Sequence, residues 1–153
     1  MSRKEYHAPM HTAEHILNGT MDRMFGCGRS FNAHIERKKS KCDYRLPRPL
    51  APDELQAVEA AVNRVIRDDL PVAERMVSRA EAEARYFTGK LPAAAGETIR
   101  IVSVGDYDGC PCIGQHVGRT GEIGAFRIVS ADHADGVLRL RFVVTPAEDA
   151  ARL

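Results

Sequence analysis

The sequence predicts an α+β domain in which helices pack on a largely antiparallel sheet. Apolar residues recur every three or four positions in some stretches and every second position in others, so both helices and strands are expected. Two pairs of strands are separated by short turns, which favours hairpins and therefore antiparallel pairing. With 153 residues, 44% of them hydrophobic, the chain has the length and composition of one domain with its own core. We expect a single domain over residues 1–153, with a frayed tail at 145–153.

The N-terminal part is predicted as a helix followed by a hairpin. Apolar residues at spacings of three and four indicate a helix over 9–25, and the glycine-rich stretch 26–28 ends it. Alternating apolar residues at 31–35 and 42–46 then indicate two strands. The charged residues near 37–41 are expected to form the turn between them.

The middle of the chain is predicted as helix, strand and helix. A proline followed by an aspartate is a typical helix start, and apolar residues at helical spacing follow it over 55–66. Residues 72–77 are expected to form a short strand. A short helix over 78–86 is expected next, because Ser78 and Glu81 have the spacing of a capping box.

The C-terminal part is predicted as a strand, a long loop and a final hairpin. The β-branched residues at 98–104 favour a strand. Six glycines fall within 105–124, which we predict to be a long structured loop, and loops of that length are usually functional or disordered. Residues 126–130 and 137–144 are expected to pair as a hairpin across the turn Asp135-Gly136.

The composition excludes several classes of function. The formal net charge is only +1, so no overall basic field indicates a general nucleic-acid binder. The absence of tryptophan and the 6% aromatic content argue against a stacking platform for single strands. The four cysteines are too few for a disulfide framework. Neither a signal peptide nor an apolar stretch of about 18 residues is present, so we expect a soluble, cytoplasmic protein without a membrane partner.

Two motifs have the spacing of metal ligands. His11 and His15 are four positions apart on the first predicted helix, so their imidazoles leave the same face. Cys112 and His116 lie in the glycine-rich loop, whose backbone can direct both side chains to one point. Together they would provide one thiolate and three imidazoles to a tetrahedral metal, or three ligands and an open position.

Other interpretations of these motifs remain open at this point. The histidine pair could belong to a solvated helix face, and Cys112 could be a buried apolar side chain. A closed structural zinc site is a second possibility, although a chain of this length needs no metal to fold. HTAEH also matches the inverted zinc-protease motif, with Glu14 as general base and Glu81 or Glu83 as third ligand, but that interpretation leaves CIGQH unexplained.

The segments HTAEHILNG and DGCPCIGQHVGRTGEIGAFRIVS together resemble the second additional domain of alanyl- and threonyl-tRNA synthetases. The closest similarity is to free-standing alanyl-tRNA editing proteins of the AlaX type, and it extends from Met10 to about Val144. The two metal motifs occur in the order and with the separation that the family has. TGEIG before a phenylalanine-containing strand is the stretch most similar to the alanyl members, and RYFTGK is similar to their aromatic-Gly-x-Lys segment.

This resemblance implies a zinc-dependent hydrolase that cleaves the ester between a wrong amino acid and the 3′ end of a tRNA. It assigns His11, His15, Cys112 and His116 as the zinc ligands. The implied substrate is Ser-tRNA(Ala) or Gly-tRNA(Ala). The alternatives are another misacylated tRNA, as in threonyl-type editors, and a non-catalytic RNA-binding module whose zinc is structural.

The resemblance also suggests residues that contact the substrate. Ser30 stands where the family often lines its acyl pocket. Gln115 replaces the threonine that the family usually has before the last histidine, a departure that bears on amino-acid specificity and not on the metal. Lys90, in the RYFTGK segment, is expected to contact the tRNA 3′ end.

Two further sets of residues are candidates for a role in hydrolysis or in RNA binding. Glu14 and Asp108 are carboxylates next to the metal motifs, and each could serve as general base or as hydrogen-bond partner of a ligating histidine. Residues 35–48 hold six basic and two acidic residues, a net charge of +4. We expect this hairpin to lie on the phosphate backbone of a tRNA. Its candidate RNA contacts are Arg37, Lys38, Lys39 and Lys41.

Overall fold

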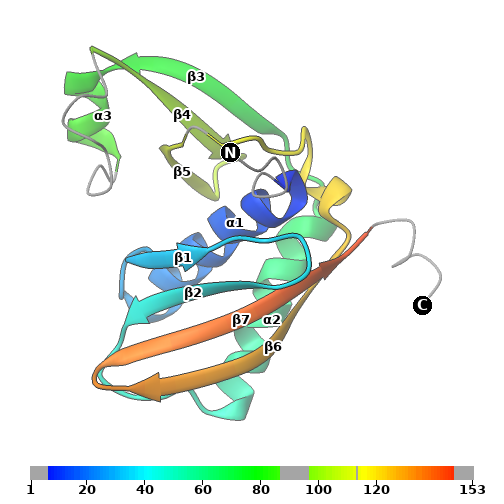
Figure 1. Ribbon diagram of the computed structural model, residues 1–153. Coiled ribbons are helices and arrows are strands. Elements are labelled where there is room, and N and C mark those ends of the chain that lie inside the picture. Colours follow the sequence, from blue (N-terminus) through cyan, green and yellow to red (C-terminus); the bar gives the residue numbers. More distant parts are fainter. Residues whose placement is uncertain (1–6, 87–96, 113, 147–153) are drawn as a thin grey trace.

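The computed structural model describes residues 7–86, 97–112 and 114–146 and confirms an α+β fold with two antiparallel sheets (Figure 1). The larger sheet has the strand order β1-β2-β7-β6, and the smaller has the order β3-β4-β5. The elements in chain order are α1 (Ala8–Phe25), β1 (Asn32–His34), β2 (Ser40–Arg45), α2 (Pro52–Arg67), β3 (Val72–Ser78), α3 (Arg79–Arg85), β4 (Thr98–Val104), β5 (Asp108–Pro111), the 3-10 helix η2 (Thr120–Ile123), β6 (Ala125–Ala134) and β7 (Val137–Thr145).

Helix α1 lies between the two sheets and contacts β7 of the larger one and β5 of the smaller one (Figure 1). A proline in its first turn favours the helical start. The helix ends at Gly26, whose φ of 62° suits a residue without Cβ and whose N–H donates to the carbonyl of Asp22. Because both sides of the helix are covered, its polar residues His15 and Asn18 are buried as well as its apolar ones. The helix therefore presents polar groups to the interior of the domain.

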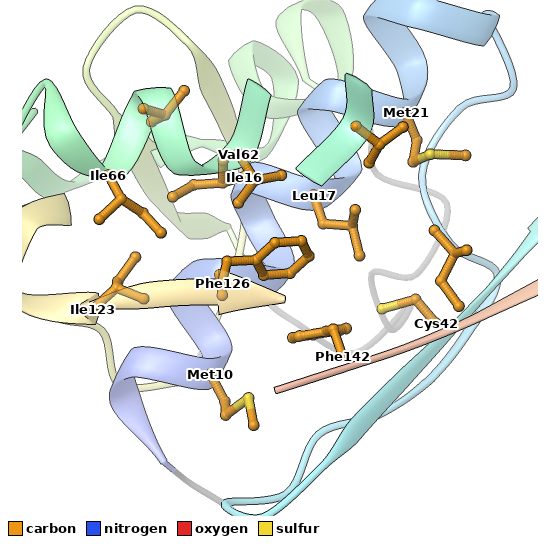
Figure 2. Close-up of a cluster of buried hydrophobic side chains, with 14 of the residues drawn as sticks. Met10, Ile16, Leu17, Met21, Cys42, Val62, Ile66, Ile123, Phe126 and Phe142 are labelled. Atoms are coloured by element: carbon orange, nitrogen blue, oxygen red, sulfur yellow. The ribbon is translucent and has the colours of Figure 1, made fainter. Parts of the chain in front are cut away.

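The main hydrophobic core fills the space between α1, α2 and the larger sheet (Figure 2). The rings of Phe126 on β6 and Phe142 on β7 pack with their centroids 5.2 Å apart. Asn63 of α2 bonds the edge of β6: its amide donates to the carbonyl of Phe126 and its carbonyl accepts from the Phe126 N–H. These contacts fix α2 to the larger sheet. The largest fully buried side chains are Tyr44, Phe142, Met10, Ile16, Leu17, Met21, Ile101, Ile123, Leu138, Leu140, Val58 and Val62.

The smaller sheet carries its own small core on one face. Val77, Ala82, Ile99 and Ile101 pack there beneath α3. Successive side chains of a strand point to opposite faces, so Arg100 of β4, which lies between two members of this core, is on the other face of the sheet. That other face is turned toward α1, because Cys110 of β5, paired with Val102 on this face, lies 3.2 Å from His15 of α1.

The structure corrects the prediction of one continuous loop over 105–124. Strand β5 and the helix η2 lie inside this range. Glycine, cysteine and proline have little intrinsic preference for a strand, but β5 is paired to β4, with Gly109 opposite Ser103. Strand β6 also continues to Ala134, beyond the predicted end at 130. Thr145 belongs to β7, and the rest of the expected tail, from residue 147, lies outside the described residues.

No helix in the described part of the chain combines the length and the apolar character needed to cross a membrane.

Candidate metal centre

The fold brings the two predicted metal motifs together. The ligand atoms of His15, Cys112 and His116 all lie within 4.8 Å of one another. His15 comes from α1, and the other two residues follow β5, so residues about a hundred positions apart meet where α1 contacts the smaller sheet. Cys112 Sγ is 3.2 Å from His116 Nε2. One nitrogen of each histidine and one sulfur thus face a common point.

His11 lies next to this trio without belonging to it. Its ring stands edge-on to that of His116, with the centroids 6.1 Å apart. A Cβ placed on Gly114 would lie 3.2 Å from His11 Nδ1 and 3.7 Å from Cys112 Sγ. Any side chain at position 114 would therefore fill the space between His11 and the thiol. The glycine leaves room for the fourth predicted ligand to approach a shared cation.

The hydroxyl of Thr12 fixes the orientation of His116. Thr12 Oγ1 is 3.1 Å from His116 Nδ1, accepts a hydrogen bond from the Val117 N–H, and donates to the carbonyl of Ala8. Because the hydroxyl donates its hydrogen bond to Ala8, it can accept a hydrogen bond from Nδ1–H of His116. Nε2 of His116 is then unprotonated, with its lone pair on the side of Cys112. Burial, helped by the positive charges of His15, His11 and Arg100, lowers the pKa of His116 to about 3. At neutral pH His116 is therefore uncharged, as a metal ligand must be.

Thr12→Val is expected to weaken metal binding by about tenfold, because the loss of a hydrogen-bond partner of a ligating histidine typically reduces affinity by roughly 10–100-fold. Valine preserves the shape of the side chain but cannot accept from His116 or Val117. Metal affinity measured by competition with a chromogenic chelator checks this. Thr20→Val is the matched control, since Thr20 is also buried on α1 but bonds Ile16 and Tyr107 instead. Equal metal affinity for the two variants would contradict this role of Thr12.

The Nδ1 side of His15 contacts a buried ion pair between Asp108 and Arg29. Its Nδ1 lies 3.4 Å from Asp108 Oδ2 and 3.2 Å from Cys110 Sγ. Both oxygens of Asp108 are bound in turn by Arg29, at 2.6 and 3.1 Å. With Nδ1 directed to Asp108, Nε2 is the nitrogen left to face a cation, the arrangement found in carboxylate–histidine–metal sites.

The charges at this centre suit a cation. Burial opposes protonation of His15, but its hydrogen bonds to Asp108, Cys110 and Cys112 outweigh burial and raise its pKa well above the ordinary value. Burial also opposes ionisation of the Cys112 thiol. The hydrogen bond and charge of His15, together with the Gly114 N–H at 3.3 Å, outweigh it and lower the pKa of Cys112. A protonated His15 thus provides the positive charge that a cation would present to the same groups.

The donor set fits zinc. A thiolate with imidazole nitrogens is the set that borderline-soft divalent metals prefer, and zinc binds such sets with tetrahedral geometry. Three or four protein ligands are within reach, depending on the approach of His11. Hard cations such as magnesium would instead require oxygen ligands, and the carboxylate of Asp108 is already engaged by Arg29.

Comparison with known proteins places this centre in a family. A model described as the threonyl and alanyl tRNA synthetase second additional domain matches residues 99–141, which include Cys112 and His116. Alanine–tRNA ligases from Aeropyrum pernix and Gluconobacter oxydans are 38% and 37% identical to the chain, over 87% and 94% of its length. The chain belongs to the second additional domain family. It spans only 15% and 17% of the length of those two ligases, so the match concerns this domain within them.

The structure places the remaining predicted residues of this second additional domain as follows. Glu14 is half-buried on α1, and its carboxylate makes no hydrogen bond or ion pair with another described residue. Ser30 is buried; its N–H donates to Asn18, while its hydroxyl has no hydrogen-bond partner among the described residues. Gln115 is exposed in the loop between Cys112 and His116. Asp108 bonds Arg29 and His15, so its geometry is that of a positioning residue.

The basic hairpin of the domain lies at the same end of α1 as the metal centre. Arg37, Lys38 and Lys39 are exposed in the turn between β1 and β2, and Lys41 is half-buried on β2. Burial of His7, together with the nearby charge of Arg37, lowers the pKa of His7, which precedes α1. The turn is therefore close to the start of the helix that carries His11 and His15 (Figure 1). Lys90 lies outside the described residues.

Sequence reasoning missed several residues of this centre. Thr12 stands between the two histidines of the motif, but a threonine in a helix gives no sign of bonding a residue more than a hundred positions away. Arg29 follows the helix in a glycine-rich stretch and has no recognisable motif. Cys110 lies against His15, a contact that its position in the loop did not indicate, while the alternative ligand Glu81 pairs with Arg75 and Arg85 at α3.

Proposed function

We propose that this domain is a zinc-dependent hydrolase that deacylates mischarged tRNA, with Ser-tRNA(Ala) or Gly-tRNA(Ala) as substrate. The observation that supports it most strongly is the convergence of His15, Cys112 and His116, with His11 beside them. Membership of the second additional domain family and the similarity to alanine–tRNA ligases support tRNA as partner and alanine as the cognate amino acid. Such an activity belongs in the cytoplasm, where aminoacyl-tRNA is made and used.

The proposed metal ligands are His11, His15, Cys112 and His116. When bound there, zinc supplies a Lewis acid that can polarise an ester carbonyl and lower the pKa of a bound water. Thr12 and Asp108 keep the rings of His116 and His15 oriented toward the centre. The residues of the chain thus prearrange the site before the substrate arrives.

A carboxylate that acts as general base must be free to accept a proton. Asp108 does not meet this condition, because both of its oxygens accept from Arg29. Glu14 precedes His15 on α1 and is half-buried, and its carboxylate makes no hydrogen bond or ion pair with a described residue. We assign the general base to Glu14, whose carboxylate would accept a proton from the attacking water and later release it to the departing ribose oxygen.

The amino acid and the tRNA would be bound by different parts of the domain. The buried Ser30 hydroxyl, which lacks a partner among the described residues, is suited to a polar group of the substrate, since buried hydroxyls are normally hydrogen-bonded. Gln115 lies exposed beside His116 and could contact the same amino acid from the entrance. The exposed Arg37, Lys38 and Lys39, with Lys41 and Lys90, would contact the phosphates near the tRNA 3′ end.

A deacylation assay on Ser-tRNA(Ala), Gly-tRNA(Ala) and Ala-tRNA(Ala) tests the function. We expect the first two to be hydrolysed and Ala-tRNA(Ala) to be spared, and we expect a chelator to abolish the activity until Zn²⁺ is restored. Hydrolysis of Ala-tRNA(Ala) at the same rate would contradict a proofreading role. Hydrolysis of a different misacylated tRNA instead, such as Ser-tRNA(Thr), would show that the proposed substrate is wrong and that the proposed reaction is right.

A further inference from the structure

Arg100 of β4 contacts the metal-ligand loop, residues 112–116, which follows the neighbouring strand β5 of the same sheet. Its Nη1 donates to the carbonyl of Cys112 at 2.8 Å and to that of Gly114 at 2.9 Å. The Cys112 N–H in turn donates to the Arg100 carbonyl at 3.2 Å, which continues the β4–β5 pairing by one residue. One arginine therefore contacts both ends of the segment between the thiolate and the glycine that borders His11.

The guanidinium is almost fully engaged in these structural bonds. Besides the two carbonyls, its Nε donates to Glu74 at 3.1 Å and its Nη2 also donates to Glu74. Four of the five N–H groups of an arginine are thus used within the domain. Few donors remain for a phosphate or another substrate group, so a direct role in substrate binding is disfavoured.

The charge of Arg100 is electrostatically unfavourable for a neighbouring cation, so an attraction to the metal cannot explain why an arginine lies here. The guanidinium is always charged and therefore repels a cation bound by the nearby ligands. Glu74, opposite Val102 on β3, partly offsets this charge by pairing with the guanidinium. Because an arginine beside a metal centre costs electrostatic free energy, its benefit must lie in the geometry of the bonds it makes.

We propose that Arg100 is a positioning residue that holds the Cys112–His116 loop in the geometry needed to bind the metal. This inference rests on the proposed metal site. The planar guanidinium can donate to two carbonyls and a carboxylate at once, whereas a lysine ammonium is a single point with a flexible stem and cannot span them. Without the arginine, the carbonyls of Cys112 and Gly114 would be free to rotate. The Cys112 thiol would then lose its orientation, and the space that Gly114 leaves for His11 would change shape.

The test compares Co²⁺ binding by the wild type, Arg100→Lys and Arg100→Ala. Cobalt is used because its visible absorption reports both affinity and ligand geometry. We expect both variants to bind Co²⁺ about 10–100-fold more weakly, as is typical when the outer partners of a metal site are lost. We also expect altered absorption bands, without rescue by lysine. Arg75→Ala is the matched control: this arginine of β3 lies on the other face of the same sheet, pairs with Glu81 and should leave Co²⁺ binding unchanged.

Several results would overturn the inference. Wild-type Co²⁺ affinity and spectrum in Arg100→Lys would show that charge alone suffices. Wild-type Co²⁺ affinity in both variants, with a raised KM for tRNA and unchanged kcat, would show that Arg100 contacts substrate. Thermal melting of each variant separates loss of folding from loss of geometry, and Arg100→Lys is the variant expected to remain folded.

The same experiment distinguishes this inference from the proposed function. A wild-type protein that binds no Co²⁺ would overturn both. A wild-type protein that binds Co²⁺ but deacylates no tRNA would overturn the proposed function, while weaker Co²⁺ binding by the Arg100 variants would still support the positioning role. Active wild-type protein with unaffected Arg100 variants would overturn this inference alone.

Discussion

Cys112→Ala is expected to lower the rate of deacylation by more than about a hundredfold, because even the outer partners of metal ligands typically contribute roughly 10–100-fold. The thiol is the only sulfur in the group formed with His15 and His116, and alanine cannot replace a thiolate ligand. Single-turnover deacylation and zinc content, measured on the same preparation, check the prediction. Both should fall together.

The matched control for this change is Cys27→Ala. Cys27 is half-buried as Cys112 is, but it follows α1, its thiol donates to the backbone carbonyls of Met21 and Gly28, and it packs against the main core. Turnover and zinc content should stay at the wild-type level in this variant. A Cys112→Ala protein that retains full turnover would contradict the metal chemistry. A Cys112→Ala protein without a cooperative melting transition would favour the structural-zinc alternative, since the main core lies between α1, α2 and the larger sheet and should fold without metal.

Asp108→Asn is expected to lower the free energy of unfolding by about 3 kcal/mol, because removing one partner of a buried ion pair leaves an uncompensated charge and typically costs roughly 3–5 kcal/mol. The side chain of Asp108 is 6% exposed and that of Arg29 is 14% exposed, so water can replace little of the lost interaction. Urea-induced unfolding measures the effect. Asp132→Asn is the control: that carboxylate pairs with Arg141 but is 69% exposed, and surface pairs contribute about 0–1 kcal/mol.

A double variant separates the two roles of Asp108. Replacing Asp108 by leucine and Arg29 by methionine removes both charges, and such apolar replacements often restore stability. Metal affinity should remain reduced, because His15 has then lost the carboxylate that orients its Nδ1. Restored stability with wild-type metal affinity would show that Asp108 does not position His15. Wild-type stability and wild-type metal affinity in Asp108→Asn, together with loss of activity, would assign Asp108 as the general base in place of Glu14.

The sequence predicted those parts of the fold that depend on local periodicity. Helix α1, helix α2 and the β6–β7 hairpin follow from apolar spacing and from turn residues such as Asp135-Gly136, and the structure confirms the α+β class. Strand β5 could not be predicted because its residues gain their strand conformation from pairing with β4. The signal for that pairing lies in the partner strand and not in DGCP itself.

The candidate site likewise has residues that the sequence predicted and residues that it did not. Sequence spacing alone predicted that His11 and His15 lie on one helix face and that Cys112 and His116 lie in one loop. The groups that orient them are single residues from distant elements: Thr12 for His116, Asp108 with Arg29 for His15, and Arg100 for the loop. Each makes a few long-range hydrogen bonds, which leave no periodic pattern in a single sequence.

The central claim is that one cation is bound by the thiolate of Cys112 and by imidazoles from both motifs. X-ray absorption at the zinc edge of the zinc-loaded domain measures this most directly. We predict one sulfur at about 2.3 Å and two or three nitrogens at about 2.0–2.1 Å, with the sulfur lost in Cys112→Ala. A shell without sulfur, or a sulfur that persists in Cys112→Ala, would contradict the account.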